Sequence, residues 1–454
     1  MLYRIALILS LTTLLFSNSY SQYKVANDNH NLMGTRVSVS NIFTLDQCII
    51  YALKNQPAVN QSHLDEEIAR ANRSIAISGW LPQVTGGANL QHWIELPTSF
   101  LPVNGVSTPV HTGVSNTSNP NIAATQTLFS NEVLLAAKAA NLSIQAAKEN
   151  TKAAKIQLVS DVSKAFYDIL LSLERINVYQ EDTSRLNKNQ ADAYHRYVSG
   201  VSDKVDYKQA TIALNNSQAQ LRTANEEVKG KYAILKQLMG CPAEEKLTVI
   251  FDTAQMIQGI YVDTLATLHL EKRVEYKQLQ LLKRIQHLTT SYYRNGFIPS
   301  LSAFYNYNYQ FQAQQFSDLY GKAYPNSYVG LSLSVPLFSG LKRWDNIHKS
   351  KLQEERIDWD EVNLKLGIYT EYQTALAAYK SNLYNLHAQS DNVAMAREVY
   401  NIVKLQYSEG IKAYLDVIVA ESDLQQSEIN YLNALFQVLG SKVNLEKAMG
   451  DINP

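Results

Sequence analysis

Cysteine is nearly absent from this chain of 454 residues, which contains only Cys48 and Cys241. Two cysteines cannot build a disulfide-dense scaffold or a cysteine-rich metal site. A net charge of one sign is also absent, because 41 Lys and Arg residues balance 41 Asp and Glu residues. This balance argues against a nucleic-acid-binding protein, which normally carries a basic surplus.

Long apolar runs are missing as well, apart from a short one at the start of the chain. Arg4 gives a positive start, Ile5–Phe16 is too short to span a bilayer, and Ser21 ends the segment with a small residue. This pattern predicts a signal peptide at residues 1–21, and the alternative interpretation is a first core helix. After this segment no apolar run reaches about 18 residues. We therefore expect an exported chain that is periplasmic, secreted or inserted in a membrane as a β-barrel.

Glycine and proline are scarce in four long tracts. Asn131–Ser199 and Leu341–Glu409 contain no proline and at most one glycine. Gly200 and Gly410 follow these tracts, and each is followed in turn by a shorter tract without proline. The tracts are rich in Ala, Leu, Gln, Lys and Glu, which favour helices. The sequence therefore predicts two long helical hairpins that turn at the two glycines.

Apolar residues within these tracts recur at alternating steps of three and four. One such seam contains Val159, Val162, Phe166, Ile169, Leu173 and Ile176. This spacing is typical of left-handed coiled coils. Further helices are predicted at Thr44–Ser78 and Thr264–Asn295. If these helices stack on the shorter arms of the hairpins, each long helix has a composite partner along its whole length.

The two halves of the chain repeat one another. Tyr197-Val-Ser-Gly200 matches Tyr407-Ser-Glu-Gly410, and Asp206 and Asp416 follow the two glycines at the same spacing. We expect one repeat at residues 22–260, with a hairpin at 131–239, and a second at 261–454, with a hairpin at 341–449.

Period-two alternation predicts two strands in each repeat. Residues 300–312 place Leu, Ala, Tyr and Phe on one face and mostly Ser, Asn and Gln on the other. Residues 326–338 alternate similarly, and 83–95 and 121–129 occupy the matching places in the first repeat. The stretch Leu96–Asn119 is predicted to be a long exposed loop. Strands of about 10 residues suit a bilayer crossing, although a soluble sandwich with a buried tyrosine face is the alternative.

Four strands cannot close a barrel, because about eight is the practical minimum. An open sheet edge cannot lie in lipid with unsatisfied backbone groups. If the strands lie in a membrane, several copies of the chain must share one barrel, and symmetry then places the helices in a ring.

The strand–helix junctions Ala123-Ala-Thr-Gln-Thr-Leu-Phe-Ser130 and Val329-Gly-Leu-Ser-Leu-Ser-Val-Pro-Leu-Phe-Ser-Gly340 resemble those of the TolC-type outer-membrane efflux proteins. So do Ala52-Leu-Lys-Asn-Gln-Pro57, Trp80-Leu-Pro-Gln83 and the two Tyr-x-x-Gly tips. The resemblance covers roughly residues 41–450. It implies a homotrimer with one 12-stranded β-barrel, four strands per chain, continued by a long α-helical periplasmic barrel.

The resemblance also implies roles for residues near the tips. The family places acidic residues six and nine positions after the second tip glycine, and here these positions hold Asp416 and Val419. Lys412 matches a basic position that helps to hold the closed state, and Tyr407 matches a tip tyrosine. The valine predicts a weaker cation preference than in relatives with two acidic rings.

Asp206 occupies the corresponding place in the first repeat, so Asp206 and Asp416 are the predicted pore carboxylates. In a symmetric ring, copies of Asp416 would face one another and attract cations. The alternative is that both aspartates only favour the positive ends of their helices.

Enzyme motifs are absent from the sequence, which contains no His-Glu-x-x-His, Gly-x-x-x-x-Gly-Lys, Gly-x-Gly-x-x-Gly or Gly-x-Ser-x-Gly. We expect no catalytic activity and no cofactor. Cys48 and Cys241 lie near helix ends that are predicted to meet, so a disulfide between them is left open.

The predicted function is an outer-membrane exit duct of a tripartite efflux or type I secretion system. Its partners would be outer-membrane lipid, a periplasmic membrane-fusion adaptor and an inner-membrane pump of the RND or ABC type. The adaptor would dock at the tips, which contain Arg196, Tyr197, Gly200 and Gly410. The competing interpretations are a periplasmic coiled-coil adaptor or structural envelope protein without a pore, and an enzyme.

Overall fold

A computed structural model of the chain describes residues 42–103, 106–250, 259–263 and 267–454. The predicted signal peptide at residues 1–21 lies outside these residues. The chain divides into two units, each described by itself. The described part of the smaller unit contains two short parallel strands, β1 (Ile42–Phe43) and β8 (Thr248–Val249). All other elements belong to the larger unit.

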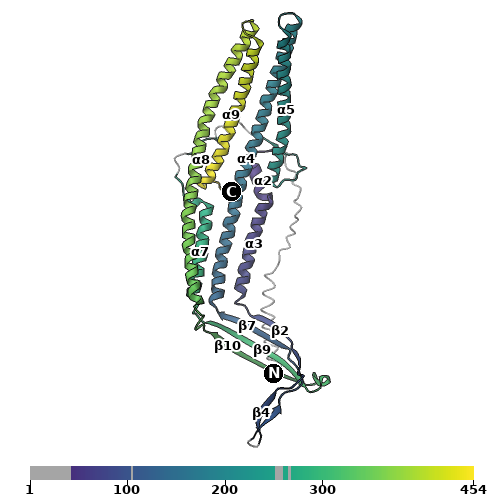
Figure 1. The fold of residues 1–454 in the computed structure, drawn as a ribbon, viewed down its shortest axis with the longest axis vertical. Helices are drawn as coiled ribbons and strands as arrows, with labels where there is room; N and C mark the ends of the chain where they lie inside the picture. Colours follow the sequence, from purple (N-terminus) through teal and green to yellow (C-terminus); the bar gives the residue numbers. More distant parts are fainter. Residues whose placement is uncertain (1–41, 104–105, 251–258, 264–266) are drawn as a thin grey trace. The chain divides into compact units, whose positions relative to one another are not determined.

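The helices of the larger unit form two hairpins, each with a further helical segment along its long arm. The first group contains α2 (Leu45–Asn55), α3 (Pro57–Ser78), α4 (Asn131–Val198) and α5 (Lys204–Met239). The second contains the 3₁₀ turn η1 (Leu270–Lys272), α7 (Val274–Arg294), α8 (Lys342–Ser408) and α9 (Tyr414–Met449). Figure 1 shows α5 and α3 along α4, and α9 and α7 along α8, as the contacts between these helices also indicate. Each long helix therefore has a composite partner, as the sequence predicted.

Local sequence explains where these helices begin and end. Thr44 caps α2 by accepting a hydrogen bond from the backbone N–H of Gln47 at 3.4 Å. The prediction of one helix over Thr44–Ser78 is wrong, because the chain is extended at Gln56 and a new helix starts at Pro57. Proline restricts the residue before it to extended conformations and fits the first position of a helix.

The prediction of a helix from Thr264 is also wrong in its starting point, because α7 begins at Val274. Arg273 is extended and buried, and its guanidinium donates hydrogen bonds to the carbonyl of Ala448 at 2.8 Å and to Glu371 at 2.7 Å. The contacts of this side chain with α8 and α9 fix the backbone at the start of α7.

The strands of the larger unit form one six-stranded antiparallel sheet and a separate two-stranded one, β4 (Thr98–Val103) with β5 (Val106–His111). The larger sheet contains β2 (Gln83–Gly87), β3 (Leu90–His92), β6 (Asn116–Ser118), β7 (Asn121–Phe129), β9 (Ser300–Ala313) and β10 (Ala323–Ser334). Both β6 and β7 pair with β9, and β2 and β3 pair with β7 and β6 respectively. The six strands are therefore four long ones, because β2 and β3 are separated by only two residues, and so are β6 and β7.

The prediction of a loop over Leu96–Asn119 is wrong. This stretch contains β6 and a hairpin of β4 (Thr98–Val103) and β5 (Val106–His111), whose backbones pair in antiparallel register. It is rich in Pro, Ser and Thr and lacks alternation of apolar and polar residues, so its sequence contained no strand signal. The hairpin is defined by backbone pairing between its two strands.

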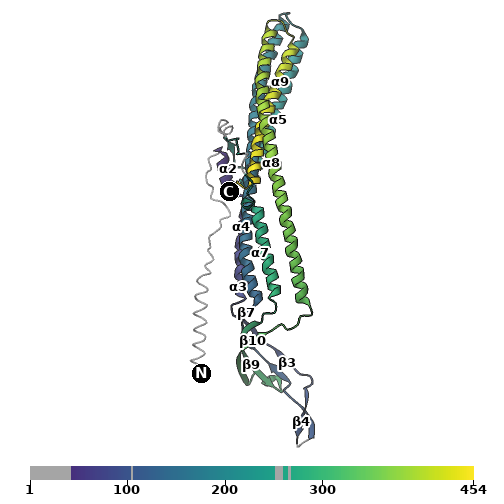
Figure 2. The ribbon, with the colours of Figure 1, turned by 90° about the vertical axis from the view of Figure 1, so that its left-hand side faces the viewer.

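The core of the larger unit lies along α4 and α9, which contact one another (Figure 2). In the upper half, buried residues from α4, α5, α8 and α9 form one cluster that includes Ala193, Ala210, Tyr400, Val417 and Leu424. No helix among the described residues is both long enough and apolar enough to cross a lipid bilayer.

Candidate functional site

The two hairpin tips have nearly identical turns. Gly200 and Gly410 adopt φ angles of 72° and 77°, a region that favours glycine. The N–H of each glycine donates to the carbonyl three residues earlier, Tyr197 or Tyr407, at 3.0 and 3.1 Å. The residue after each glycine donates to the carbonyl of Arg196 or Gln406. The repeat seen in the sequence is therefore a repeat of backbone geometry, which ends each long helix by the same mechanism.

Contacts across the tips join the first hairpin to the second. The guanidinium of Arg196 on α4 lies 4.8 Å from the ring centroid of Tyr407 on α8. Its Nη2 donates to the carbonyl of Ser408 at 3.4 Å. The prediction assigned Arg196 to an external docking surface and Tyr407 to the pore. The structure brings these two residues together and leaves Tyr197 against Tyr207 of its own hairpin, with ring centroids 6.3 Å apart.

Aromatic side chains fill the space behind this contact. The rings of Tyr407 and Tyr414 are 5.4 Å apart, and Tyr414 is almost completely buried. Burial raises the pKa of Tyr407 and of Tyr414. The Arg196 guanidinium lowers that of Tyr407, Glu421 raises that of Tyr414, and the Asp206 carboxylate raises both to a smaller extent. Asp206 of the first hairpin thus acts electrostatically on tyrosines of the second.

The second predicted pore carboxylate, Asp416, makes local contacts in this structure. Its Oδ2 accepts a hydrogen bond from the N–H of Ala413 at 3.2 Å and lies 3.9 Å from Nζ of Lys412. Both charged side chains are 45% exposed. Asp416 therefore caps the first turn of α9, and its half-exposed carboxylate is also available to solvent.

Apolar side chains are exposed around the two tips. Those that are more than half exposed are Val198, Val201, Val205, Leu405, Ile411, Leu415 and Val419. Their number on two neighbouring turns exceeds what isolated surface positions explain, and such patches mark interaction sites.

One face of the sheet is apolar in every long strand. Register places Val84 of β2 beside Ala124 of β7, Ala124 beside Tyr305 of β9, and Tyr305 beside Val329 of β10. On β10, Val329, Leu331 and Leu333 are 78%, 69% and 64% exposed. This face has no cover within the described part of the chain.

The opposite face of the sheet is mainly polar. It contains Thr85, Asn306 and Asn308, and the amide Nδ2 of Asn308 donates to Oδ1 of Asn326 at 2.9 Å. An apolar outer face and a polar inner face suit a sheet that separates lipid from water.

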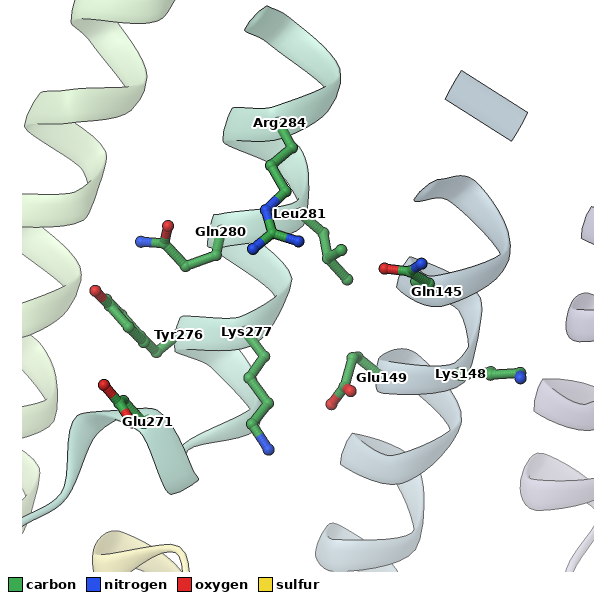
Figure 3. A pocket seen from close by; sticks show the side chains of 9 residues that line it. All are labelled: Gln145, Lys148, Glu149, Glu271, Tyr276, Lys277, Gln280, Leu281 and Arg284. Atoms are coloured by element: carbon green, nitrogen blue, oxygen red, sulfur yellow. The ribbon is translucent and has the colours of Figure 1, made fainter. Parts of the chain in front are cut away.

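A depression lined by residues of α4, η1 and α7 lies between these helices. Figure 3 shows Glu149 and Lys277 pointing toward the space between the helices, whereas Lys148 points away from it. Within the described ranges, no three His, Cys, Asp or Glu residues are grouped to hold a metal ion. The depression offers scattered charges and no arrangement of nucleophile and base.

Cys48 and Cys241 are both free thiols. Burial raises the pKa of the Cys48 thiol to about 12, and burial and Glu245 raise that of Cys241 to about 11. These thiols are protonated at neutral pH and poorly nucleophilic.

The sequence interpretation missed a buried polar network between α4 and α9 that includes Asp182, Arg185 and Glu421. A signal was present, because Glu421 and Glu428 lie one heptad apart among apolar residues of α9. Only the contact between the hairpins shows that these carboxylates are buried.

Comparison with known proteins agrees with these features. The family model of the outer membrane efflux proteins matches residues 49–241 and 291–451. The solvent efflux pump outer membrane protein SrpC of Pseudomonas putida is 22% identical over 313 residues, which cover 67% of this chain and 64% of that protein. The chain thus matches slightly less than two thirds of that relative's length.

Other relatives match over more of their length. The outer membrane protein TolC of Escherichia coli is 19% identical over 445 residues, covering 92% of this chain and 84% of that protein. The crystal structure of the open state of the MtrE outer membrane channel of Neisseria gonorrhoeae superposes with a TM-score of 0.70 at 19% identity, covering 89% of this chain and 88% of that one.

The fold therefore defines a member of a class built from two tandem strand–strand–helical-hairpin repeats. The chain belongs to the outer membrane efflux protein family, as the sequence predicted. It is an outer-membrane protein with a helical periplasmic part. The family is one of outer-membrane channels and is not an enzyme family.

Proposed function

We propose that copies of this chain assemble into a closed channel that conducts substrates from an inner-membrane pump across the outer membrane. The observation that carries this proposal is the sheet, which has an exposed apolar face and two open edges within the described residues. Lipid would cover the apolar face, and neighbouring copies would pair with the edges.

The strand directions permit such closure. Consecutive strands in the order β2, β7, β9 and β10 are antiparallel, so β2 and β10 run in opposite directions. When β10 of one copy meets β2 of the next, the new pair is again antiparallel. Three copies, the number that the family resemblance implies, give 12 strands and leave no edge.

An exposed seam on α8 supports association of the helices as well. Leu352, Trp359, Val362, Leu366 and Tyr369 are 49–69% exposed and follow one another at steps of seven, three, four and three. At 100° per residue these side chains lie on one face, roughly opposite the buried Ile357 and Ile368. A heptad seam without a partner among the described residues suits the helix of a neighbouring copy.

Within this channel, we propose that Asp416 and Asp206 line the narrow periplasmic end, with Lys412 and Tyr407 beside them. The half-exposed Asp416 carboxylate supports this role, since three symmetric copies would create a cation-attracting ring. The exposed apolar tips around Gly200 and Gly410, including Tyr197 and Arg196, would receive the periplasmic adaptor.

The substrate class would be small toxic molecules or exported proteins, delivered by an RND- or ABC-type pump. The competing adaptor interpretation is disfavoured because two hairpins alternate with strand pairs in this fold.

The full-length chain, expressed and extracted from outer membranes in detergent, tests this proposal. We expect an oligomer with the mass of three chains that dissociates on heating in denaturing detergent, and discrete conductance steps after insertion in planar bilayers. A detergent-solubilised monomer without conductance would contradict the proposal. A gene deletion tested against dyes, detergents and antibiotics would identify the substrate class.

A further inference from the structure

A buried polar network joins the two hairpins several helical turns from their tips. Arg185 on α4 donates through Nε to Oε1 of Glu421 on α9 at 3.3 Å. Asn189, one turn further along α4, donates through Nδ2 to the other oxygen of Glu421 at 2.9 Å. The carboxylate of Glu421 is therefore held from both sides by the first hairpin.

Asp182 extends the network along α4. Its Oδ1 accepts a hydrogen bond from Nη2 of Arg185 at 3.3 Å. Its Oδ2 accepts hydrogen bonds from Ser217 of α5 and Gln425 of α9, both at 2.7 Å. Three helices thus converge on this carboxylate.

The two carboxylates are far more buried than the cation between them. The side chains of Asp182 and Glu421 are 3% and 4% exposed, whereas that of Arg185 is 23% exposed. A buried charge is costly unless it is paired, and one guanidinium must serve two carboxylates here.

The other charged residues nearby do not supply a second buried cation for the two carboxylates. Glu428, one heptad along α9, is 11% exposed and pairs with the 62% exposed Arg397 of α8 at 2.8 Å. Its Oε2 is buried without a hydrogen-bond partner in the described part of the chain. Glu181 of α4 is exposed and lies 4.0 Å from Arg185. The interior between the hairpins therefore contains more carboxylates than cations.

The surplus of buried carboxylates raises the pKa of Glu421. Burial, and then the nearby Asp182 charge, raise the pKa of Glu421 to about 7, although Arg185 and Asn189 lower it. Burial also raises the pKa of Asp182. Glu421 in the packed hairpins can therefore gain or lose a proton near neutral pH.

We propose that the inter-hairpin network of Asp182, Arg185, Asn189 and Glu421 is a proton-sensitive contact: proton uptake by Glu421 favours packing of α9 against α4, and proton loss favours their separation. This inference rests on the proposed function, in which separation of the hairpins opens the periplasmic end of a channel. It adds that the open fraction of this channel depends on periplasmic pH.

The sign follows from linkage between proton binding and packing. In separated hairpins Glu421 is in water and has its ordinary pKa of 4.5, so the packed state binds the proton more tightly. Stabilisation of the packed state is complete below that value and is lost as the pH rises through 7. Between pH 8.5 and pH 6, the ratio of packed to separated hairpins should rise about tenfold.

The distance between the tips tests this proposal directly. Spin labels at Ser199→Cys and Glu409→Cys, in full-length protein in detergent with Cys241→Ser, would report hairpin separation from pH 5.5 to 8.5. We expect the short-distance population to stay constant above about pH 8 and to grow as the pH falls below 7. A distance distribution that does not change with pH would overturn the proposal.

Two variants distinguish titration of Glu421 from a general effect of acid. Glu421→Gln resembles the protonated side chain, so its short distance should persist at every pH. Asn189→Ala removes a donor that lowers the pKa of Glu421, so this growth should begin at higher pH. Asp423→Asn removes an exposed carboxylate from the same helix and should titrate like the parent.

The outcome is independent of channel activity. An unchanged pH dependence in both Glu421→Gln and Asn189→Ala would overturn the proton-sensitive contact, even if the same protein conducts ions in bilayers. Loss of conductance with a normal distance titration would contradict the proposed function instead.

Discussion

The two hairpins have almost the same backbone and opposite patterns of burial. Their long helices have 68 and 67 residues and their short helices 36 each. In the first hairpin the long helix α4 contains most of the buried residues, whereas in the second it is the short helix α9. The partners α5 and α8 bury few positions. The two hairpins therefore differ in role: α4 and α9 form a buried inner pair, and α5 and α8 flank it.

This difference indicates where copies meet. Helices α4 and α9 contact one another within the chain, so their apolar seams are already covered. The flanking helix α8 retains an exposed seam that no other element of the described residues covers. Substitutions in the exposed seam of α8 and in the covered contacts between the hairpins should therefore have different consequences.

Breaking the exposed seam of α8 should have the largest effect. Trp359→Glu combined with Leu366→Glu would place charges where a neighbouring copy is expected to pack. Burying each large apolar side chain contributes about 1.5–3 kcal/mol per copy, so we expect loss of the oligomer with retention of helical structure. Size-exclusion chromatography with light scattering and circular dichroism would measure both.

The matched control for the seam is Asp360→Lys, which changes an exposed charge on the same turn of α8. This position lies between the buried and the exposed apolar faces, so the oligomer should persist. If the oligomer persists after the double substitution, the exposed seam of α8 does not form the interface between copies.

The contact between the tips should have the next largest effect. Arg196→Ala removes both the cation above the Tyr407 ring and the hydrogen bond to Ser408. Together these contacts are worth about 1–2 kcal/mol, which corresponds to roughly a 5- to 30-fold change in the open fraction. Single-channel recording should show longer open times, and exposed Arg222→Ala should not.

The two tip aspartates should differ in cation binding. Asp416→Ala should reduce block of conductance by divalent cations, because the ring of carboxylates is lost. Asp416→Asn should reduce block equally while preserving an acceptor for the Ala413 N–H. Asp206→Asn should have a smaller effect, since Asp206 lies beside buried tyrosines. Equal block in the parent and both Asp416 variants would contradict the ring.

The smallest effects concern two glycines of the first hairpin. Gly200→Ala forces a non-glycine residue to a φ of 72° and should destabilise the turn by about 1 kcal/mol. Gly230→Ala lies inside α5 with open space around the added methyl and should stabilise the helix by about 0.5–1 kcal/mol. Chemical denaturation of both variants would measure these opposite signs, and two changes of equal sign would contradict this account.

The sequence predicted the positions of helices and strands better than the contacts between them. Breaker-free tracts located the four long helices, and alternation located the long strands, since both signals depend only on neighbouring residues. The break at Pro57 was readable from the proline itself. The start of α7 was not, because the contacts of Arg273 with Ala448 and Glu371 decide it.

The candidate site was predictable only in part. The turns at Gly200 and Gly410 followed from glycine spacing, and the structure confirms them. The contact of Arg196 with Tyr407 and the burial of Glu421 both depend on how one hairpin packs on the other. No periodicity within a single helix contains that information.

The opposed directions of β2 and β10 have a genetic consequence. Each copy would join one neighbour through β2 and the other through β10, so one subunit that cannot pair at β10 would leave one seam of the ring open. A variant that still assembles but cannot pair at β10 should therefore act dominantly, because in cells that produce both forms only rings made wholly of unaltered subunits would remain sealed.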